Sequence, residues 1–211
     1  MHLRDYIHSD RINNFSCFSK SYLLDYLLQT EQYWIGKYVR TLRKEEFYTF
    51  YRKNKFLRYY YFRKKNILGR KLGFFIGAGC FDAGLKIYHY GSIIVNPKSR
   101  IGKNCTIHGN CCIGSKGGIP DDSPVIGDNV DIGQNAQILG GITVADGVRI
   151  GAGAIVTKSI LIPDVTVVGI PANHYFWNFP WTIATHTVCL NNFFLLCSKL
   201  CFFHLGIWTF H

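Results

Sequence analysis

Several signatures that would assign a function directly are missing from this chain of 211 residues. Its cysteines and histidines lack the paired spacing of a zinc site, so no metal is predicted. No secretory leader is recognised, and no nucleic-acid-binding motif accompanies the positive charge. The cysteines are therefore expected to be buried, reduced thiols. They are Cys17, Cys80, Cys105, Cys111, Cys112, Cys189, Cys197 and Cys201.

Acidic residues are scarce, and the positive charge is concentrated at one end. The sequence has 24 Lys and Arg against 13 Asp and Glu, a net charge of +11. Residues 1–76 hold 16 of the basic and 6 of the acidic residues. Proline is absent from residues 21–66, where apolar side chains recur at intervals of three and four. This pattern predicts two helices, over residues 21–43 and 44–66, the second ending within residues 66–69.

A period of six dominates the middle of the chain. An aliphatic residue stands at every sixth position in two tracts, separated by an insertion loop that includes residues 116–124. The members are Val95, Ile101, Ile107 and Ile113, then Ile126, Ile132, Ile138, Val144, Ile150, Val156, Ile162 and Val168. Because six fits neither a helix nor an alternating strand, the repeat must be stacked to bury these side chains. Three short strands and three bends per turn predict a β-solenoid over residues 77–172.

Small and turn-forming residues follow the aliphatic positions and are expected to form the bends. They include Gly102, Asn104, Gly127, Asn129, Gly133, Asn135 and Gly151. Neighbouring residues of a strand point to opposite faces, so one of Cys111 and Cys112 should point inward and the other outward, without a bridge between them.

Four segments of this tract carry a resemblance to a known family. They are residues 85–95, 126–141, 150–156 and 168–172. Together they resemble the hexapeptide-repeat acyltransferases, and within these the serine O-acetyltransferase-like branch. The resemblance covers about residues 75–172. It implies a mainly β fold, a left-handed parallel β-helix with a short N-terminal α-helical region, and an acetyl-CoA-dependent enzyme that acts as a cytoplasmic homotrimer.

Three regions are expected on this basis. Residues 1–76 form a basic, aromatic helical region, residues 77–172 the acyltransferase domain, and residues 173–211 an atypical apolar tail. For the helical region, packing in the trimer and capping of the solenoid are favoured over a membrane-surface patch, and a nucleic-acid platform is the weakest alternative. The tail has one Lys and no Asp or Glu. Membrane contact and a reading-frame change in the gene both fit its abrupt change of composition.

The candidate general base is His89. It matches the position of the catalytic histidine in the serine acetyltransferase family, and a neutral imidazole can take a proton from a hydroxyl group at cell pH. The family histidine follows an aspartate, where this chain has Tyr88. Asp82 is therefore the nearest candidate for a carboxylate that orients the ring. The alternatives are a structural, hydrogen-bonded role for His89 and a surface turn role for Asp82.

Acceptor binding is expected near the insertion loop and one coil beyond His89. Where the family has a histidine that contacts the acceptor's carboxylate, this chain has Ser123, directly after Asp122. Without that imidazole, an amino acid acceptor loses a cationic partner, which strengthens the case for a sugar hydroxyl. His108 follows His89 by 19 residues, so the two should lie on neighbouring coils of one face. The acceptor-binding candidates are thus His108, Tyr88, Asp122 and Ser123, with a plain surface role as the alternative for His108.

Acetyl-CoA binding is implied by the resemblance and not by a phosphate-binding motif. The matching positions are Gly114, Ser115, Gly133, Gln134, Gly151, Ala152 and Lys158. Bend formation explains most of the glycines equally well, and Lys158 could be an ordinary solvated lysine. Three functions remain open: serine acetylation for cysteine synthesis, O-acetylation of a sugar hydroxyl in surface-polysaccharide synthesis, and a non-catalytic solenoid that serves as a binding module.

Overall fold

The computed structural model describes residues 3–14, 21–117 and 122–175. Helices come first: α1 (Leu3–Asn14), α2 (Ser21–Leu28), α3 (Glu31–Glu46) and α4 (Lys55–Leu72), with a π-helical turn η1 (Phe47–Tyr51) before α4. The tail beyond residue 175, with Cys189, Cys197 and Cys201, lies outside the described residues, and so does Cys17.

The helix boundaries differ from the two predicted helices. The first is interrupted at Gln29, which has a φ of 54°, and α3 then starts behind the N-cap Thr30. The second begins at Lys55 and not at residue 44, because α3 runs on to Glu46 and η1 follows it. It also continues past residues 66–69, so both of its predicted ends are wrong. Gly69 lies inside α4 and does not end it. Glycine is needed at this position because a Cβ would collide with the backbone of Phe74. The helix ends instead at Gly73, whose φ of 82° is a left-handed conformation typical of a helix C-terminus.

The strands form three sheets, parallel except for the last pair. Sheet A has the order β1 (Phe74–Ile76), β3 (Ile93–Val95), β6 (Cys112–Gly114), β9 (Gln137–Leu139) and β12 (Ile155–Val156). Sheet B has β10 (Thr143–Val144), β7 (Val125–Ile126) and β4 (Arg100–Ile101). Sheet C has β14 (Asn173–His174), β13 (Thr166–Val168), β11 (Arg149–Ile150), β8 (Asp131–Ile132), β5 (Thr106–Ile107) and β2 (Lys86–Ile87).

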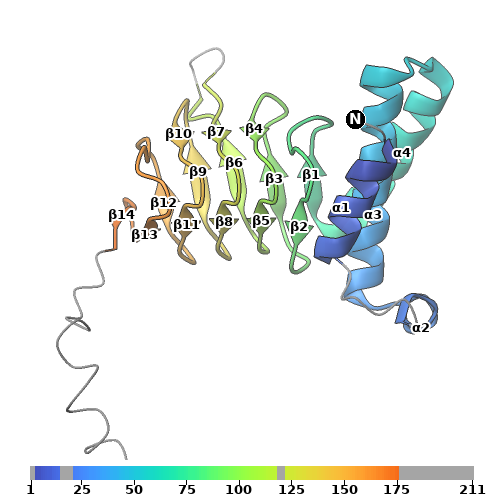
Figure 1. Cartoon of the computed structure of the whole chain (residues 1–211), viewed down its shortest axis with the longest axis horizontal. Coiled ribbons are helices and arrows are strands. Elements are labelled where there is room, and N and C mark those ends of the chain that lie inside the picture. Colours follow the sequence, from blue (N-terminus) through green and yellow to red (C-terminus); the bar gives the residue numbers. More distant parts are fainter. Residues whose placement is uncertain (1–2, 15–20, 118–121, 176–211) are drawn as a thin grey trace, which may run out of the picture. The chain divides into compact units, whose positions relative to one another are not determined.

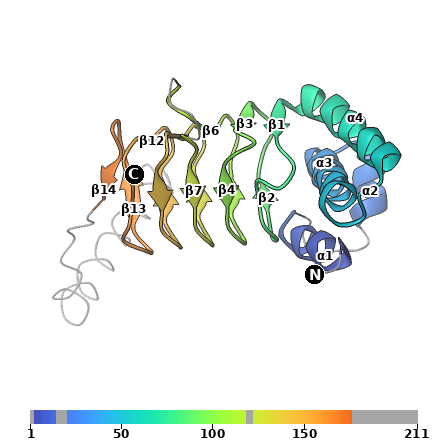
Figure 2. The ribbon, with the colours of Figure 1, turned by 90° about the horizontal axis from the view of Figure 1, so that it is seen from above.

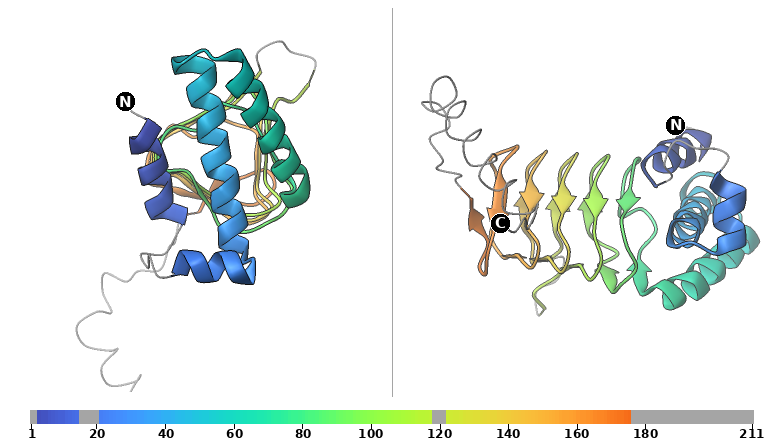
Figure 3. Two further views of the ribbon diagram at one scale, coloured as in Figure 1. Left: turned by 90° about the vertical axis from the view of Figure 1, so that its right-hand side faces the viewer. Right: turned by 90° about the horizontal axis from the view of Figure 1, so that it is seen from below.

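Successive strands pass from sheet C to sheet A, then to sheet B and back to sheet C, so the chain winds as a three-sided coil (Figure 1; Figure 3, left). The prediction of a mainly β protein with parallel sheets and a short helical region is confirmed. Figure 2 shows the helices gathered at the end of the coil that carries β1 and β2.

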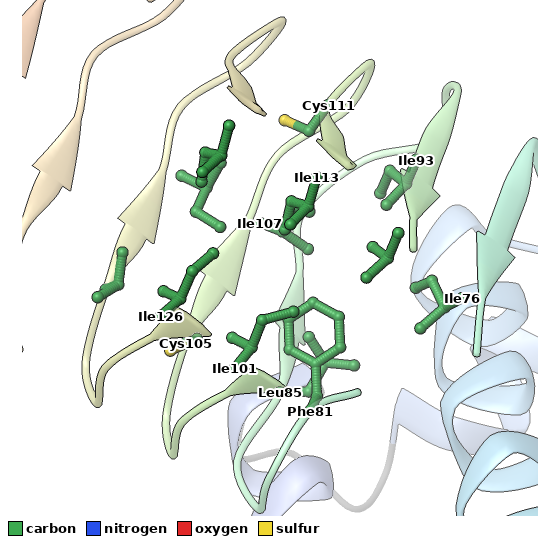
Figure 4. Close-up of a cluster of buried hydrophobic side chains, with 14 of the residues drawn as sticks. Ile76, Phe81, Leu85, Ile93, Ile101, Cys105, Ile107, Cys111, Ile113 and Ile126 are labelled. Atoms are coloured by element: carbon green, nitrogen blue, oxygen red, sulfur yellow. The ribbon is translucent and has the colours of Figure 1, made fainter. Parts of the chain in front are cut away.

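The aliphatic repeat fills the interior of the coil. Its members from Val95 to Val156 are all buried, and Figure 4 shows part of the resulting stack, including Ile101, Ile107 and Ile113. The last two predicted members are wrong: Ile162 is 56% exposed, and Ile160 takes the interior position at 6%. Val167 likewise replaces Val168. The cause is a shorter last coil. Val144 pairs with Ile160 after 16 residues and Ile150 with Val167 after 17, whereas Ile132 pairs with Ile150 after 18.

Left-handed residues mark the corners, as the turn-forming residues predicted. Asn104, Asn129 and Asn135 have φ values of 53°, 56° and 61°. Asparagine tolerates this conformation better than other residues with a side chain.

The described cysteines are unbridged. Cys80, Cys105 and Cys111 are buried and Cys112 is partly buried, which confirms the predicted inward and outward pair. Burial raises the pKa of the Cys80 thiol to about 11 and that of Cys105 to about 12. Both thiols are therefore protonated at neutral pH and unreactive.

A buried arginine joins the helices to the first coil. Arg43 of α3 is almost fully enclosed, and its guanidinium donates to both carboxylate oxygens of Asp10 (2.6 and 3.2 Å) and to Glu46 (2.9 Å). It also donates to the backbone carbonyl oxygens of Phe81 (2.8 Å) and Asp82 (2.6 Å). Burial opposes the charge of Arg43, but Glu46 and Asp10 hold the pKa of the guanidinium above its ordinary value. This charged network adds to the apolar contacts of the junction, where Tyr38 packs edge-on against Phe74 at 5.1 Å between ring centroids.

None of the helices in the described part of the chain is long and apolar enough to cross a membrane.

Candidate functional site

His89 lies where β2 ends and the chain turns toward β3. Its side chain is 59% exposed, and its Nδ1 atom lies 3.3 Å from Oε2 of Glu31, which is 28% exposed. The other carboxylate oxygen of Glu31 accepts the backbone N–H of Tyr90 at 2.5 Å. One carboxylate from the start of α3 therefore holds both the imidazole and the backbone beside it.

Local packing fixes the backbone of the His89 turn. Gly91 has a φ of 134°, and its N–H donates to the carbonyl of Leu72 at the end of α4. The side chain of Asn110, one coil away, accepts the N–H of Ser92 at 2.9 Å. Gly109 lies against the turn, since a Cβ there would come within 2.6 Å of the Tyr90 carbonyl oxygen. The helices and the second coil thus position His89 together.

Asp82 is not the carboxylate at His89, and that expectation is wrong. Its Oδ1 atom accepts the Tyr6 hydroxyl at 2.8 Å and the N–H of Ala83 at 2.7 Å. It lies between sheets B and C, before β2, and lines a cavity of about 400 Å³ between the helices and the coil. The physical reason is that seven residues carry the chain through a corner and a whole strand, so proximity in sequence does not bring the two side chains together.

Glu31 was missed by sequence reasoning. It stands 58 residues before His89, and an acidic residue in the first turn of a helix is already explained by the helix dipole. Burial raises the pKa of the Tyr90 hydroxyl, and the Glu31 carboxylate raises it further. No local signal in the sequence links Glu31 to the β2 turn.

Tyr88 and His108 form a stacked pair beside His89. Their ring centroids are 4.4 Å apart with an interplanar angle of 24°. The first coil has 20 residues, so the register aligns His108 with Tyr88 and places both histidines on neighbouring coils, as predicted. Lys86 donates to the Tyr88 hydroxyl at 2.9 Å, and Nε2 of His108 lies 3.5 Å from Asp131 Oδ1. A row of polar and aromatic groups therefore runs along sheet C next to His89.

The predicted site residues divide among the three corners of the coil. The His89 corner, between sheets C and A, comprises residues 88–92, 108–111, 133–136 and 151–154. The loop corner, between sheets A and B, comprises residues 96–99, 115–117, 122–124, 140–142 and 157–159. Gly133, Gln134, Gly151 and Ala152 share the first with His89 and His108, whereas Ser115, Asp122, Ser123 and Lys158 lie at the second, and Gly114 ends the strand that enters it.

Packing alone accounts for two of the glycines at the His89 corner. A Cβ at Gly133 would lie 2.6 Å from the Ile150 carbonyl oxygen, and one at Gly151 would lie 2.7 Å from Val168 Cγ1. Gly114 differs, because a Cβ there would meet only Cys112 Sγ at 3.8 Å. Space beside Gly114 is therefore open.

Asp122 organises the loop corner. Its carboxylate accepts the N–H of Lys116 at 3.1 Å and also the N–H of Gly141. The Lys116 ammonium donates to the Thr157 carbonyl at 3.1 Å. Asp122 thus has a structural task in the loop, while Ser123 is partly exposed and Lys158 is exposed.

Known proteins with hexapeptide repeats match the part of the sequence that forms the coil. Residues 123–158 match the family model Bacterial transferase hexapeptide (six repeats). A serine acetyltransferase of Staphylococcus xylosus is 36% identical over 124 residues, covering 54% of this chain and 56% of that protein. An Escherichia coli protein that bears the name colanic acid biosynthesis acetyltransferase WcaB is 40% identical over 82 residues, covering 39% of this chain and 49% of that protein.

Solved structures extend the likeness into the helices. The crystal structure of a serine acetyltransferase in complex with coenzyme A from Brucella abortus strain S19 has a TM-score of 0.61 and 25% identity. The match covers 82% of this chain and 65% of that one. The chain spans only 23% of the Arabidopsis thaliana serine acetyltransferase that it also matches, and 56% of the Staphylococcus protein. The predicted resemblance to hexapeptide-repeat acyltransferases of the serine acetyltransferase type is confirmed.

Proposed function

We propose that this chain is the subunit of an acetyl-CoA-dependent O-acetyltransferase resembling serine acetyltransferase, and that its coil is a left-handed β-helix. The observation that carries the proposal is the exposed imidazole of His89 held by the Glu31 carboxylate. The likeness to serine acetyltransferases in sequence and in fold supports it. The four cysteines within the described residues are free thiols, which fits a cytoplasmic location.

The His89–Glu31 pair suits general base catalysis. A proton on Nδ1 that is donated to Glu31 leaves the lone pair of Nε2 free to accept the proton of an acceptor hydroxyl. The oxygen then attacks the thioester carbonyl, and the tetrahedral intermediate collapses with loss of the CoA thiolate. The proton returns from the imidazolium to the thiolate, which leaves as the thiol. No covalent acyl-enzyme is needed.

The division of the site between corners supports a homotrimer. His89 and the insertion loop are at different corners of the same coil, so one chain does not bring them to one place. A second copy that presents its loop corner to the His89 corner of the first would complete the site. Acetyl-CoA would then lie in the groove between two protomers.

The residues at the loop corner fit the acyl donor. The open space beside Gly114 can admit an extended pantetheine arm, and the exposed ammonium group of Lys158 offers a partner for phosphate. Ser115 directly follows Gly114 at the start of the loop.

Serine is the first acceptor to test, because the relatives that carry the likeness are named for it. A sugar hydroxyl is the second. Ser123 stands where the family has a carboxylate-binding histidine, and the exposed Tyr90 beside His89 offers an aromatic side chain that suits a sugar. The likeness to the colanic acid protein points the same way.

Release of the CoA thiol from acetyl-CoA tests the proposal, with L-serine and a panel of sugars as acceptors. Acceptor-dependent release with either class supports the transferase and identifies the acceptor. A chain that releases no thiol above the rate without acceptor, across the whole panel, would be a binding module and not this enzyme.

A further inference from the structure

Helix α4 presents an exposed face that nothing in the proposed reaction uses. Its 18 residues include seven Lys and Arg and no Asp or Glu. Phe56, Tyr60, Arg63 and Ile67 follow one another at intervals of four, three and four, which places them on one side of the helix. Phe56 is 89% exposed, and Tyr60 and Ile67 are exposed as well. The face therefore combines apolar rings with cations.

A groove runs beside this face, between α4 and the first turns of α3. Its volume is about 410 Å³, and Trp34, Lys37, Tyr60, Arg63, Lys64 and Lys71 line it. The Lys37 ammonium lies 4.5 Å from the Trp34 ring centroid, and that of Lys64 lies 5.6 Å from the Tyr60 ring centroid. Four cations converge here around two aromatic rings.

Most of the positive charge of α4 is not neutralised by carboxylates in the described part of the chain. Lys65 is buried and paired with Glu45 at 3.0 Å, so its charge is neutralised. Across residues 3–14, 21–117 and 122–175, Lys65 is the only cation of α4 that forms an ion pair. The remaining positive field is directed to the surroundings, which favours an anionic partner.

We propose that this α3–α4 surface docks on an anionic phospholipid membrane. Lysine and arginine near such a surface are attracted to its negative charge, while aromatic rings settle at the headgroup level. A second copy of the same face would bring like charges together, which disfavours self-association there. Nucleic acid would satisfy the cations but gives no reason for the protruding Phe56. In the docked arrangement α4 lies along the membrane surface, with Phe56 at the headgroup level.

The inference does not depend on the proposed function, because it uses no residue of the His89 corner or the loop corner. Trp34 is nevertheless one turn from Glu31 on α3. Docking would hold the His89 corner close to the membrane surface.

Cosedimentation of the full chain with lipid vesicles tests the inference. One set contains phosphatidylcholine alone, and the other contains equal amounts of phosphatidylcholine and phosphatidylglycerol. We expect binding to the anionic vesicles that weakens with added salt. The double variant Arg63→Glu/Lys71→Glu should lower the partition coefficient by at least about thirtyfold, and Phe56→Ser by about tenfold.

Matched controls lie on the coil. Lys103→Glu/Arg149→Glu changes the net charge equally at two exposed positions, and Leu161→Ser replaces an exposed apolar side chain; both should bind as the parent does. All variants keep the same tail, and equal melting temperatures confirm folding. Equal binding to both kinds of vesicle, or equal losses in the control variants, overturns the inference. The inference is also overturned if the parent binds no vesicles and the α4 variants instead change the oligomeric mass or DNA binding. The occupant of the surface would then be a second copy of the chain or nucleic acid, respectively.

Discussion

The coil is built from one kind of contact that repeats, whereas the helical region joins the coil through contacts that occur only once. In the coil, an aliphatic side chain at each repeat enters one continuous interior, and the charges over residues 77–211 nearly cancel, with 8 basic and 7 acidic residues. The helical region carries almost the whole net charge. It joins the core of the first coil through apolar side chains such as Tyr38 and Leu72, and Arg43 adds a buried charged network at the same junction. Repetition places His89, whereas a single unrepeated side chain, Glu31, orients it. The candidate site is therefore composed of one part from each region.

The largest expected effect tests the contribution of the coil. His89→Ala should lower turnover by about a hundred- to ten-thousandfold, the usual loss for a general base. Thiol release at saturating acetyl-CoA measures it. His174→Ala, at an exposed position of β14, is the control and should keep the parent rate. If His89→Ala turned over as fast as the parent, the coil would not supply the base.

The next effect tests the junction between the two regions. Arg43→Met would leave Asp10 and Glu46 as buried carboxylates without their cation and should lower the free energy of unfolding by about 3–5 kcal/mol. Urea denaturation followed by circular dichroism measures the change. Lys44→Met, one residue on and partly exposed, should change stability by about 0.5 kcal/mol or less. Similar losses in both variants would show that the network does not hold the helices to the coil.

The same contrast explains what the sequence could predict. A six-residue period repeats one physical requirement many times, so the interior positions from Val95 to Val156 could be read from the sequence. The exceptions arise where several neighbouring residues could each occupy the interior position. Ile160, Leu161 and Ile162 are consecutive aliphatics, and the period cannot tell that the last coil is two residues shorter at this position and buries Ile160.

The site was only partly predictable for a related reason. His89 could be found because it sits in a segment with a recognisable pattern, and His108 because it stands about one coil further on. Glu31 could not, since its contact with His89 depends on how α3 packs against the first coil. Asp82 shows the opposite error, where short separation in sequence suggested a contact that an intervening corner and strand prevent. A tertiary contact that occurs only once produces no repeating pattern in the sequence, so it cannot be predicted from periodicity.

A smaller effect isolates the contribution of the helical region. Glu31→Gln should lower kcat by up to about a hundredfold, because a carboxylate no longer orients the imidazole, while the KM for acetyl-CoA stays near the parent value. Glu31→Asp should recover part of the rate. Gln32→Glu, at the exposed neighbouring position, is a control for added charge and should have little effect. A rise in KM with unchanged kcat would assign Glu31 to substrate binding and not to positioning.

The smallest expected signal is a partial return of activity in mixed trimers. It tests whether the two corners meet across a protomer boundary. Gly114→Trp should fill the open space at the loop corner and stop turnover while leaving His89 intact; a Cβ there meets only Cys112 Sγ, so the fold should tolerate the change. In trimers mixed equally from this variant and His89→Ala, about a quarter of the sites would combine two intact corners, so about a quarter of the parent activity should return. Mixing His89→Ala with Glu31→Gln is the control. Those two side chains meet within one chain, so no intact pair can form and the activity should stay at the mean of the two variants. Recovery in neither mixture would place the whole reaction within a single protomer.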